Sequence, residues 1–483
     1  MKKLAFTLAF LSGAAAFAAD VDVDFAKITG KINPKLHSSG WGPRIYPRAI
    51  ENDDAKISAL GMYASRTHDW ALINPGQRLC DTHHIFPVDL DHLDPKDPRN
   101  YFFGPTDYSL TLTKNIGHKI FYRLGTSIEH TTDRHFNALA PKSYERYAEI
   151  LAGIMRHYLK GWANGFEWSD DFDGWEIWNE PDGITNCWVL RDCNEPDWKK
   201  KCEIHRDEFI KFFVTVLKRL KSEFPDQQIG GPALCWADLD YIGRLLDACQ
   251  AEGIAPDFIS WHGYTQDPVD CVARFTKVRE LLDTKGFPKT RMIFNEWHYI
   301  RTWDGIHGRN STVAAIKRAH EGPTGHLNID SAAMNVSMLC RFQDSPMDEA
   351  FYYGCAVSGN WGYQNQMRQL NKCWYSMKLF GDFVKNADDK VAFSVATNLP
   401  TVTACAAWAK DKRSASIVVV DYRGKKGKLN IGVKGLDGVQ RLTAQILDHT
   451  RDLAPLPVTW DGNGFTLTRE DENSAAFLVT LEL

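Results

Sequence analysis

Short apolar runs alternate with longer amphipathic stretches along most of the chain. The stretch 143–158 carries apolar or aromatic residues at positions 144, 147, 148, 151 and 155, the spacing of one helix face. The run 119–124 is short and rich in β-favouring residues, so it predicts a buried strand. Strands that alternate with helices in this way predict an α/β fold built on a parallel sheet.

The same pattern repeats between residues 36 and 383. The expected strands are 36–41, 63–68, 119–124, 175–180, 228–232, 258–262, 292–297 and 350–353. The expected helices are 52–60, 107–116, 143–158, 209–220, 239–251, 272–282, 332–341 and 374–383.

The pattern changes at about residue 389. Strands at 415–420, 428–433 and 475–479 follow one another without helices, which predicts a β-sandwich. We therefore expect an α/β domain at 19–388 and an accessory sandwich at 389–483. Packing against the barrel is the favoured role of the sandwich, and an independent sugar-binding module is the alternative. The segment 19–30 lacks a strand partner before it, so we expect it to pair with the sandwich.

Two of the expected strands end in Asn-Glu. One reads Trp-Glu-Ile-Trp-Asn-Glu-Pro-Asp over 175–182, and the other Met-Ile-Phe-Asn-Glu-Trp over 292–297. Because Pro181 cannot continue a ladder, the first strand should stop at Glu180, at the carboxyl rim where parallel α/β folds bind ligands. Two strand-end glutamates, Glu180 and Glu296, are the minimal set for glycoside hydrolysis.

These motifs occur in a recognisable order. Arg66-Thr67-His68 comes early, Trp178-Asn179-Glu180-Pro181 follows, and Trp261-His262-Gly263-Tyr264 precedes Glu296. The set resembles the retaining glycoside hydrolases built on a (β/α)8 barrel, clan A, and is most similar to glycoside hydrolase family 39, which includes β-xylosidases and α-L-iduronidases. The resemblance implies a TIM barrel for residues 19–388.

The resemblance also implies roles for the two glutamates and their neighbour. Glu180 would be the acid/base, with its pKa raised so that it can protonate the glycosidic oxygen. Glu296 would be the ionised nucleophile that forms a glycosyl-enzyme by double displacement. Asn179 would bind the sugar 2-hydroxyl group.

Five further residues are substrate-binding candidates. Arg66 and His68 differ by two positions, so they face the same side, where Arg66 would hold Glu296 ionised or make a structural ion pair. Tyr264 is the better candidate to contact Glu296, whereas His262 is equally compatible with a structural role. Trp361 matches the clan's aromatic platform, although residues 354–359 depart from the family pattern.

Strand alternation makes a separate prediction about the barrel interior. If Glu180 faces inward, Trp178 and Glu176 should too, and Met292 and Phe294 should share the inward side with Glu296. Glu176 would then lie too deep to reach substrate and would form a structural ion pair in the barrel floor.

The composition limits the kinds of partner that we expect this chain to bind. The chain has 57 basic and 61 acidic residues and a net charge of -4, which disfavours nucleic acid or an anionic membrane as the main partner. Residues 1–18 read as a secretory signal with two lysines, an apolar core and small residues before the cut, so we expect a secreted or periplasmic protein.

We expect no cofactor and no metal. The histidines and aspartates at 80–107 lie in a proline-punctuated insertion, where such clusters are mostly solvated. Of the 11 cysteines, Cys187, Cys193 and Cys202 crowd the segment after Glu180, so a disulfide and free thiols are equally compatible with this spacing.

The substrate class is a plant or microbial oligosaccharide or polysaccharide, and xylosides or arabinosides are among the sugars that the resemblance allows. Exo or endo action depends on whether the loops at 80–107 and 299–326 close the cleft. Two other classes stay open: a barrel that binds carbohydrate without cleaving it, and a metal-dependent hydrolase.

Overall fold

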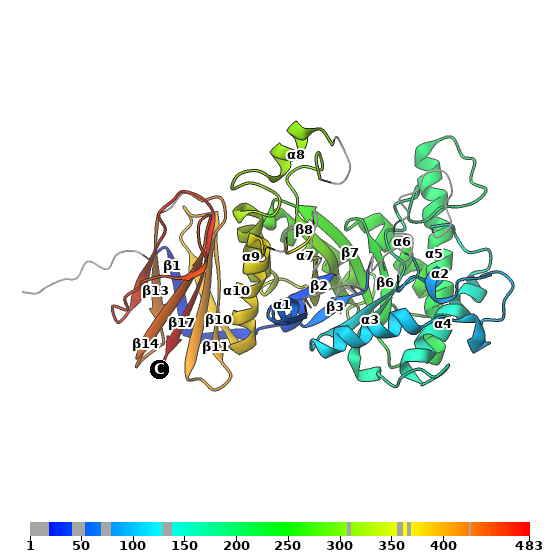
Figure 1. The fold of residues 1–483 in the computed structure, drawn as a ribbon, viewed down its shortest axis with the longest axis horizontal. Coiled ribbons are helices and arrows are strands. Elements are labelled where there is room, and N and C mark those ends of the chain that lie inside the picture. The colour runs from blue at the N-terminus through cyan, green and yellow to red at the C-terminus, as the bar shows by residue number, and fades with distance from the viewer. Residues whose placement is uncertain are drawn as a thin grey trace, which may run out of the picture.

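The chain folds into a closed barrel of eight parallel strands and a nine-stranded sheet beside it (Figure 1). The computed structural model describes residues 19–40, 54–68, 79–126, 128, 138–306, 311–354, 361–364, 369–424 and 427–483. The predicted signal at 1–18 lies outside these residues. No helix in the described part of the chain is both long and apolar enough to cross a membrane.

The barrel strands follow one another around the ring in chain order. They are β2 (Ser38–Gly40), β3 (Ala64–Arg66), β4 (Lys119–Leu124), β5 (Phe172–Ile177), β6 (Ile229–Leu234), β7 (Phe258–Thr265), β8 (Arg291–Tyr299) and β9 (Glu349–Tyr353). The helices are α1 (Asp54–Ser58), α2 (Thr82–Ile85), α3 (Gly104–Asn115), α4 (Tyr144–Leu159), α5 (Trp198–Glu223), α6 (Leu239–Ala251), α7 (Pro268–Thr284), α8 (Val313–His320), α9 (Ile329–Phe342) and α10 (Lys372–Asn386). Short 3-10 turns cover Pro34–Leu36, Pro98–Asn100 and Ser169–Asp171.

The second sheet encloses a hydrophobic core of its own and forms the β-sandwich. Its strands are β1 (Val21–Lys31), β10 (Ala387–Val395), β11 (Val402–Ala409), β12 (Ser414–Asp421), β13 (Lys428–Lys434), β14 (Arg441–Leu447), β15 (Asp452–Pro455), β16 (Gly464–Thr468) and β17 (Ala475–Glu482). Strand β1 lies between β10 and β13, so the beginning of the described chain is part of the sandwich.

Helices α9 and α10 join the two domains, since both contact strands of the sandwich and α9 also contacts β8 (Figure 1). Every residue of α9 except Arg341 is buried. One of them, Asp330, accepts hydrogen bonds from Ser474 Oγ at 2.6 Å and Arg423 Nε at 3.2 Å, both from the sandwich. The sandwich therefore covers one side of the barrel.

The alternation expected along β5 is wrong after Ile177, where the strand ends three residues before Glu180. Trp178 has a φ of 75° and packs outward, with its ring 5.2 Å from that of Trp188 and 5.4 Å from that of Phe212 on α5. A left-handed residue turns the chain, so the period of two cannot continue through it. Glu176 does face the interior, as expected.

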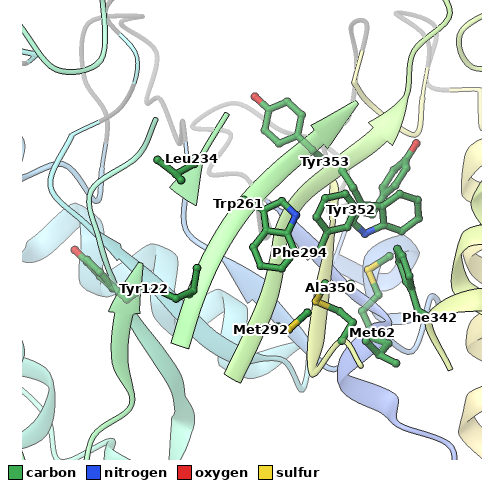
Figure 2. Close-up of a cluster of buried hydrophobic side chains, with 14 of the residues drawn as sticks. Met62, Tyr122, Leu234, Trp261, Met292, Phe294, Phe342, Ala350, Tyr352 and Tyr353 are labelled. Atoms are coloured by element: carbon green, nitrogen blue, oxygen red, sulfur yellow. The ribbon is translucent and has the colours of Figure 1, made fainter. Parts of the chain in front are cut away.

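The side expected for Met292 and Phe294 is also wrong. Both belong to the core between the barrel and its helices, where Phe294 lies near Phe342 of α9 (Figure 2). Phe294 also lies near Phe275 of α7. The interior side of β8 is instead occupied by Ile293, which packs with aromatic residues of other strands in the lower barrel.

The cysteines that follow Glu180 are not bridged. No disulfide joins any two of Cys187, Cys193 and Cys202, so the bridge that their spacing allows is absent.

Candidate active site

Glu180 lies in a tight turn beyond β5. Its φ is 48°, and its N–H donates to the carbonyl of Ala233, just before the end of β6, at 2.8 Å. Left-handed backbone costs a non-glycine residue about 1–3 kcal/mol and is concentrated at functional sites. The turn leaves the Glu180 side chain 15% exposed, at the carboxyl rim of the barrel.

Glu296 reaches the same rim because β8 contains an irregularity. Phe294 pairs with Trp261 of β7, yet Glu296 pairs with His262, so Asn295 is an extra residue on β8. A bulge of this kind lets two successive side chains face one side. Asn295 Nδ2 accordingly donates to Glu176 at 2.7 Å, while Glu296 accepts a hydrogen bond from the Tyr264 hydroxyl.

Arg66, at the end of β3, links these groups and is fully buried. Its Nε donates to Glu176 Oε2 at 2.7 Å, and its Nη1 lies 3.3 Å from Glu296 Oε2. Its Nη2 donates to Asn179 Oδ1 at 2.8 Å. The Arg66 guanidinium thus contacts Glu296, the candidate nucleophile, and Glu176, a deeper carboxylate. It also contacts Asn179, which precedes the candidate acid Glu180.

Glu176 makes the structural ion pair expected from the sequence, but next to the site instead of in the barrel floor. Besides Arg66, its carboxylate accepts from Ser260 Oγ and Asn295 Nδ2, each at 2.7 Å. A buried charge is tolerated when it is paired and hydrogen-bonded in this way. Glu176 therefore fixes Arg66 from below, while Arg66 reaches up to Glu296.

Asn179 is oriented by Arg66. Because its Oδ1 accepts from the guanidinium, its Nδ2 must be the atom that points elsewhere. That Nδ2 is buried and has no hydrogen-bond partner among the residues that the structure describes. Asn179 thus offers a fixed donor, which suits a sugar hydroxyl group.

His262 and Tyr264 on β7 contact the two glutamates. His262 Nδ1 lies 3.0 Å from Glu180 Oε1, and its Nε2 lies 3.6 Å from Glu296 Oε2. Burial lowers the pKa of His262 to about 4, so this imidazole is neutral at pH 7. Burial and the nearby Glu296 raise the pKa of Tyr264 well above its usual value, so its hydroxyl stays a donor.

Burial also raises the pKa of Glu296, and the neighbouring Glu180 adds to this effect. His262, Arg66 and the hydrogen bond from Tyr264 act in the opposite direction. The protonation of Glu296 is therefore set by a balance between burial beside a second carboxylate and three groups that favour its charge.

The two remaining candidates, His68 and Trp361, lie close to Glu296 and to Tyr264 respectively. His68 Nε2 is 3.6 Å from Glu296 Oε2, and its ring is 5.6 Å from that of Tyr353. Trp361 has its ring 5.4 Å from that of Tyr264 and 5.5 Å from that of Tyr353. The structure thus brings all eight sequence candidates to one end of the barrel.

The spacing of the central groups is short. One oxygen each of Glu180 and Glu296 and one nitrogen of His262 all lie within 4.8 Å of one another. Among the described residues, this is the set of side chains whose geometry also suits a metal ion. The loop at 80–107 contributes nothing to it, and Asp81 from that loop pairs with the buried Arg123 instead.

Sequence reasoning missed three supporting residues. Ser260 and Asn295 complete the shell around Glu176. Asp182 accepts the N–H of Cys235 at 3.1 Å and so ties the Glu180 turn to the end of β6. Asn295 directly precedes Glu296 and Asp182 follows Glu180 by two positions, so their places in the two motifs could have identified them from the sequence.

The structure thus has the closed eight-stranded barrel, the second all-β domain and the two rim glutamates that the sequence resemblance implies. Residues 96–277 match the model of glycosyl hydrolases family 39. A β-xylosidase from Geobacillus stearothermophilus is 25% identical over 182 residues, 34% of this chain and 32% of the relative. One from Caldicellulosiruptor saccharolyticus is 29% identical over 262 residues, 51% of this chain and 46% of the relative. The chain is thus similar to family 39 over its central part and spans a third to a half of these relatives.

Solved structures share nearly the whole fold. A glucosidase from Croceicoccus marinus superposes with a TM-score of 0.73 at 18% identity, covering 96% of this chain and 99% of the other. A family 39 β-xylosidase from Caulobacter crescentus gives 0.63 at 17% identity with the same coverage. An α-L-arabinofuranosidase from Thermotoga maritima gives 0.63 at 15% identity, covering 96% and 100%.

Proposed function

We propose that this protein is a retaining glycoside hydrolase in which Glu180 is the acid/base and Glu296 the nucleophile. The observation that carries the proposal is the spacing of the two carboxylates, whose nearest oxygens lie within 4.8 Å. Retaining enzymes have their carboxyl groups about 5–5.5 Å apart, whereas inverting enzymes need about 6.5–9.5 Å to admit a water molecule.

In the first step, Glu296 attacks the anomeric carbon while Glu180 gives its proton to the glycosidic oxygen. The bond to the leaving group breaks and a glycosyl ester forms on Glu296. Tyr264 and Arg66 hold Glu296 by its two oxygens, Oε1 and Oε2 respectively, which fixes the direction of attack. Asn179 Nδ2 would donate to the sugar 2-hydroxyl group as the oxocarbenium-like state develops.

In the second step, a water molecule gives a proton to Glu180 and attacks the anomeric carbon, releasing the sugar and restoring Glu296. The ester on Glu296 carries no charge, so Glu180 no longer faces a neighbouring carboxylate and can act as a base. Neutral His262, 3.0 Å from Glu180, keeps the acid/base in place in both steps.

For the substrate, we propose a β-xyloside, with arabinosides as the next class to test. The support is the name β-xylosidase carried by both of the relatives described above. The substrate is then an oligosaccharide or a fragment of a polysaccharide, as the sequence resemblance implies.

The test uses purified protein and 4-nitrophenyl glycosides of both anomers of xylose and arabinose. Proton NMR of the first product should show the anomer of the substrate. Glu180→Gln and Glu296→Gln should each lower kcat by at least about 10²-fold, the minimum for loss of an acid/base group. Glu252→Gln, an exposed glutamate paired with Lys218 on the outer surface, is the matched control.

Azide separates the two roles. With Glu180→Ala, azide should restore turnover and yield a glycosyl azide of the substrate's anomer, because it attacks the glycosyl-enzyme in place of activated water. With Glu296→Ala, azide should yield the opposite anomer. Inversion by the unmodified enzyme, or full activity of either Gln variant, would refute the proposed mechanism.

A metal-dependent hydrolase is the second candidate, because Glu180, His262 and Glu296 form a set that can hold a metal ion. Two carboxylates and one neutral imidazole are suitable zinc ligands. Dialysis against a chelator separates the candidates: activity should persist under the proposed mechanism and disappear if a metal is required.

A further inference from the structure

We propose that Trp236 forms a subsite for the leaving-group sugar, so that the natural substrate extends past Glu180 over the end of β6. The inference rests on the proposed function and adds a binding site that determines which saccharide can leave. It starts from an exposed aromatic residue: Trp236 is 55% exposed although it lies at the catalytic end of the barrel.

The position of Trp236 is fixed relative to Glu180. The N–H of Glu180 donates to Ala233 at 2.8 Å, and the N–H of Cys235 donates to both oxygens of Asp182 at 3.1 Å. These bonds tie the segment that carries Trp236 to the turn that carries Glu180. Because the acid must face the glycosidic oxygen, the leaving group lies on this side of the site.

A cleft continues from this point. It has a volume of about 240 Å³ and is lined by Trp236, His262, Tyr264, Asp270, Arg274 and Trp303, together with Trp261, Phe275 and Phe294 of the layer between the barrel and α7. His262 and Tyr264 line this cleft and also contact the two glutamates, so the cleft lies beside the candidate active site, on the α7 side of β7. Its volume is below the ~300–1,000 Å³ of sites for drug-sized ligands, which suits about one sugar ring.

The lining has the chemistry of a sugar site. The indole of Trp236 offers a flat apolar face for the C–H side of a pyranose ring. Asp270 and Arg274, paired at 2.7 Å and both exposed, offer an acceptor and donors for hydroxyl groups. An apolar face with a few polar groups is the usual composition of a small-ligand site.

The experiment compares two substrates with the same glycone. Xylobiose fills the subsite, whereas freshly prepared β-D-xylosyl fluoride has no sugar as leaving group. We expect Trp236→Ala to lower kcat/KM on xylobiose by about tenfold, the loss of a stacked ring, and to leave the fluoride unchanged. Trp236→Phe should recover most of the loss, because it keeps an aromatic face.

Trp198→Ala is the matched control, because Trp198 is 60% exposed at the start of α5 and does not line the cleft. An equal loss of kcat/KM on both substrates would show that Trp236 acts on Glu180 or on the fold. No loss of kcat/KM on xylobiose would leave the subsite without a role. Either result overturns the proposal. If the unmodified enzyme cleaves neither substrate nor the arabinose analogues, the proposed function itself fails.

Discussion

Replacing Glu176 with glutamine should test how the site sets the charge of its nucleophile. In the native structure the Arg66 guanidinium is shared between Glu176, at 2.6 and 2.7 Å, and Glu296, at 3.3 Å. Glutamine keeps the shape and one acceptor oxygen for Arg66. Its amide can donate to the Ser260 hydroxyl, which now donates to Glu176 Oε1 at 2.7 Å. The same amide replaces the oxygen that accepts from Asn295 Nδ2, so the Asn295 amide must turn over to present its oxygen instead.

The substitution removes one buried negative charge beside Arg66. The positive charge of Arg66 then acts on Glu296 alone, so the pKa of Glu296 should fall. The acidic limb of the kcat/KM profile should therefore move to lower pH. Breaking a buried ion pair costs about 3–5 kcal/mol, and the loss should be near the lower end because Arg66 keeps Glu296 and Asn179.

The assays are the pH dependence of kcat/KM on an aryl glycoside and urea unfolding at pH 7. Any displacement of Glu296 that follows from the substitution should also lower kcat, by up to about 10²-fold for a displacement of 1 Å. Glu349→Gln is the control for the pH profile of kcat/KM, because Glu349 is equally buried but lies at the opposite end of β9 from the site. An acidic limb that stays in place or moves to higher pH in a folded Glu176→Gln variant would refute the reasoning.

Three further predictions concern stability. Burial and the nearby Asp173 raise the pKa of Glu349 well above 4.5. Above pH 4.5 the unfolded chain therefore loses a proton that the folded protein keeps, so the free energy of unfolding falls as the pH rises. Glu349→Gln should flatten this slope when it is measured by urea unfolding. Burial lowers the pKa of His37 and of His118 from 6.5 to about 4, so unfolding takes up protons below pH 6.5. Each histidine should therefore lower the free energy of unfolding by about 3 kcal/mol by pH 4. His37→Gln should make this loss of stability shallower, and an unchanged acid slope would contradict the reasoning. Peptide mapping without reduction should recover Cys187, Cys193 and Cys202 as free thiols, and a reductant should leave Tm unchanged.

The fold class and the two glutamates could be predicted from sequence because their signals are local. Most of the barrel strands lie in short apolar runs, and the motif around Glu180 places an acid directly before a proline, where a strand cannot continue, although β5 itself already ends at Ile177. Arg66 was also accessible, since its two-residue offset from His68 puts both side chains on one face. The free state of the cysteines was not, because spacing does not give the distance between sulfur atoms.

The side-chain directions beside the glutamates were beyond sequence reasoning. A period of two holds only while the backbone stays extended, and it ends at Trp178, where φ is 75°. It also fails at Asn295, the extra residue of β8. Neither position is a glycine, which is the residue that most often indicates a turn or a bulge in a sequence.

These two irregularities are what brings the carboxylates together. On a regular β8, Glu296 would share the side of Phe294, which packs against α7 and α9, and could not face Glu180. The extra residue Asn295 reverses that direction, and Asn295 is held in the interior by its bond to Glu176. Glu176 also holds Arg66, which contacts Glu296 and Asn179. The buried carboxylate below the site thus anchors both the bulge and the guanidinium, and the short spacing of the two rim glutamates depends on it.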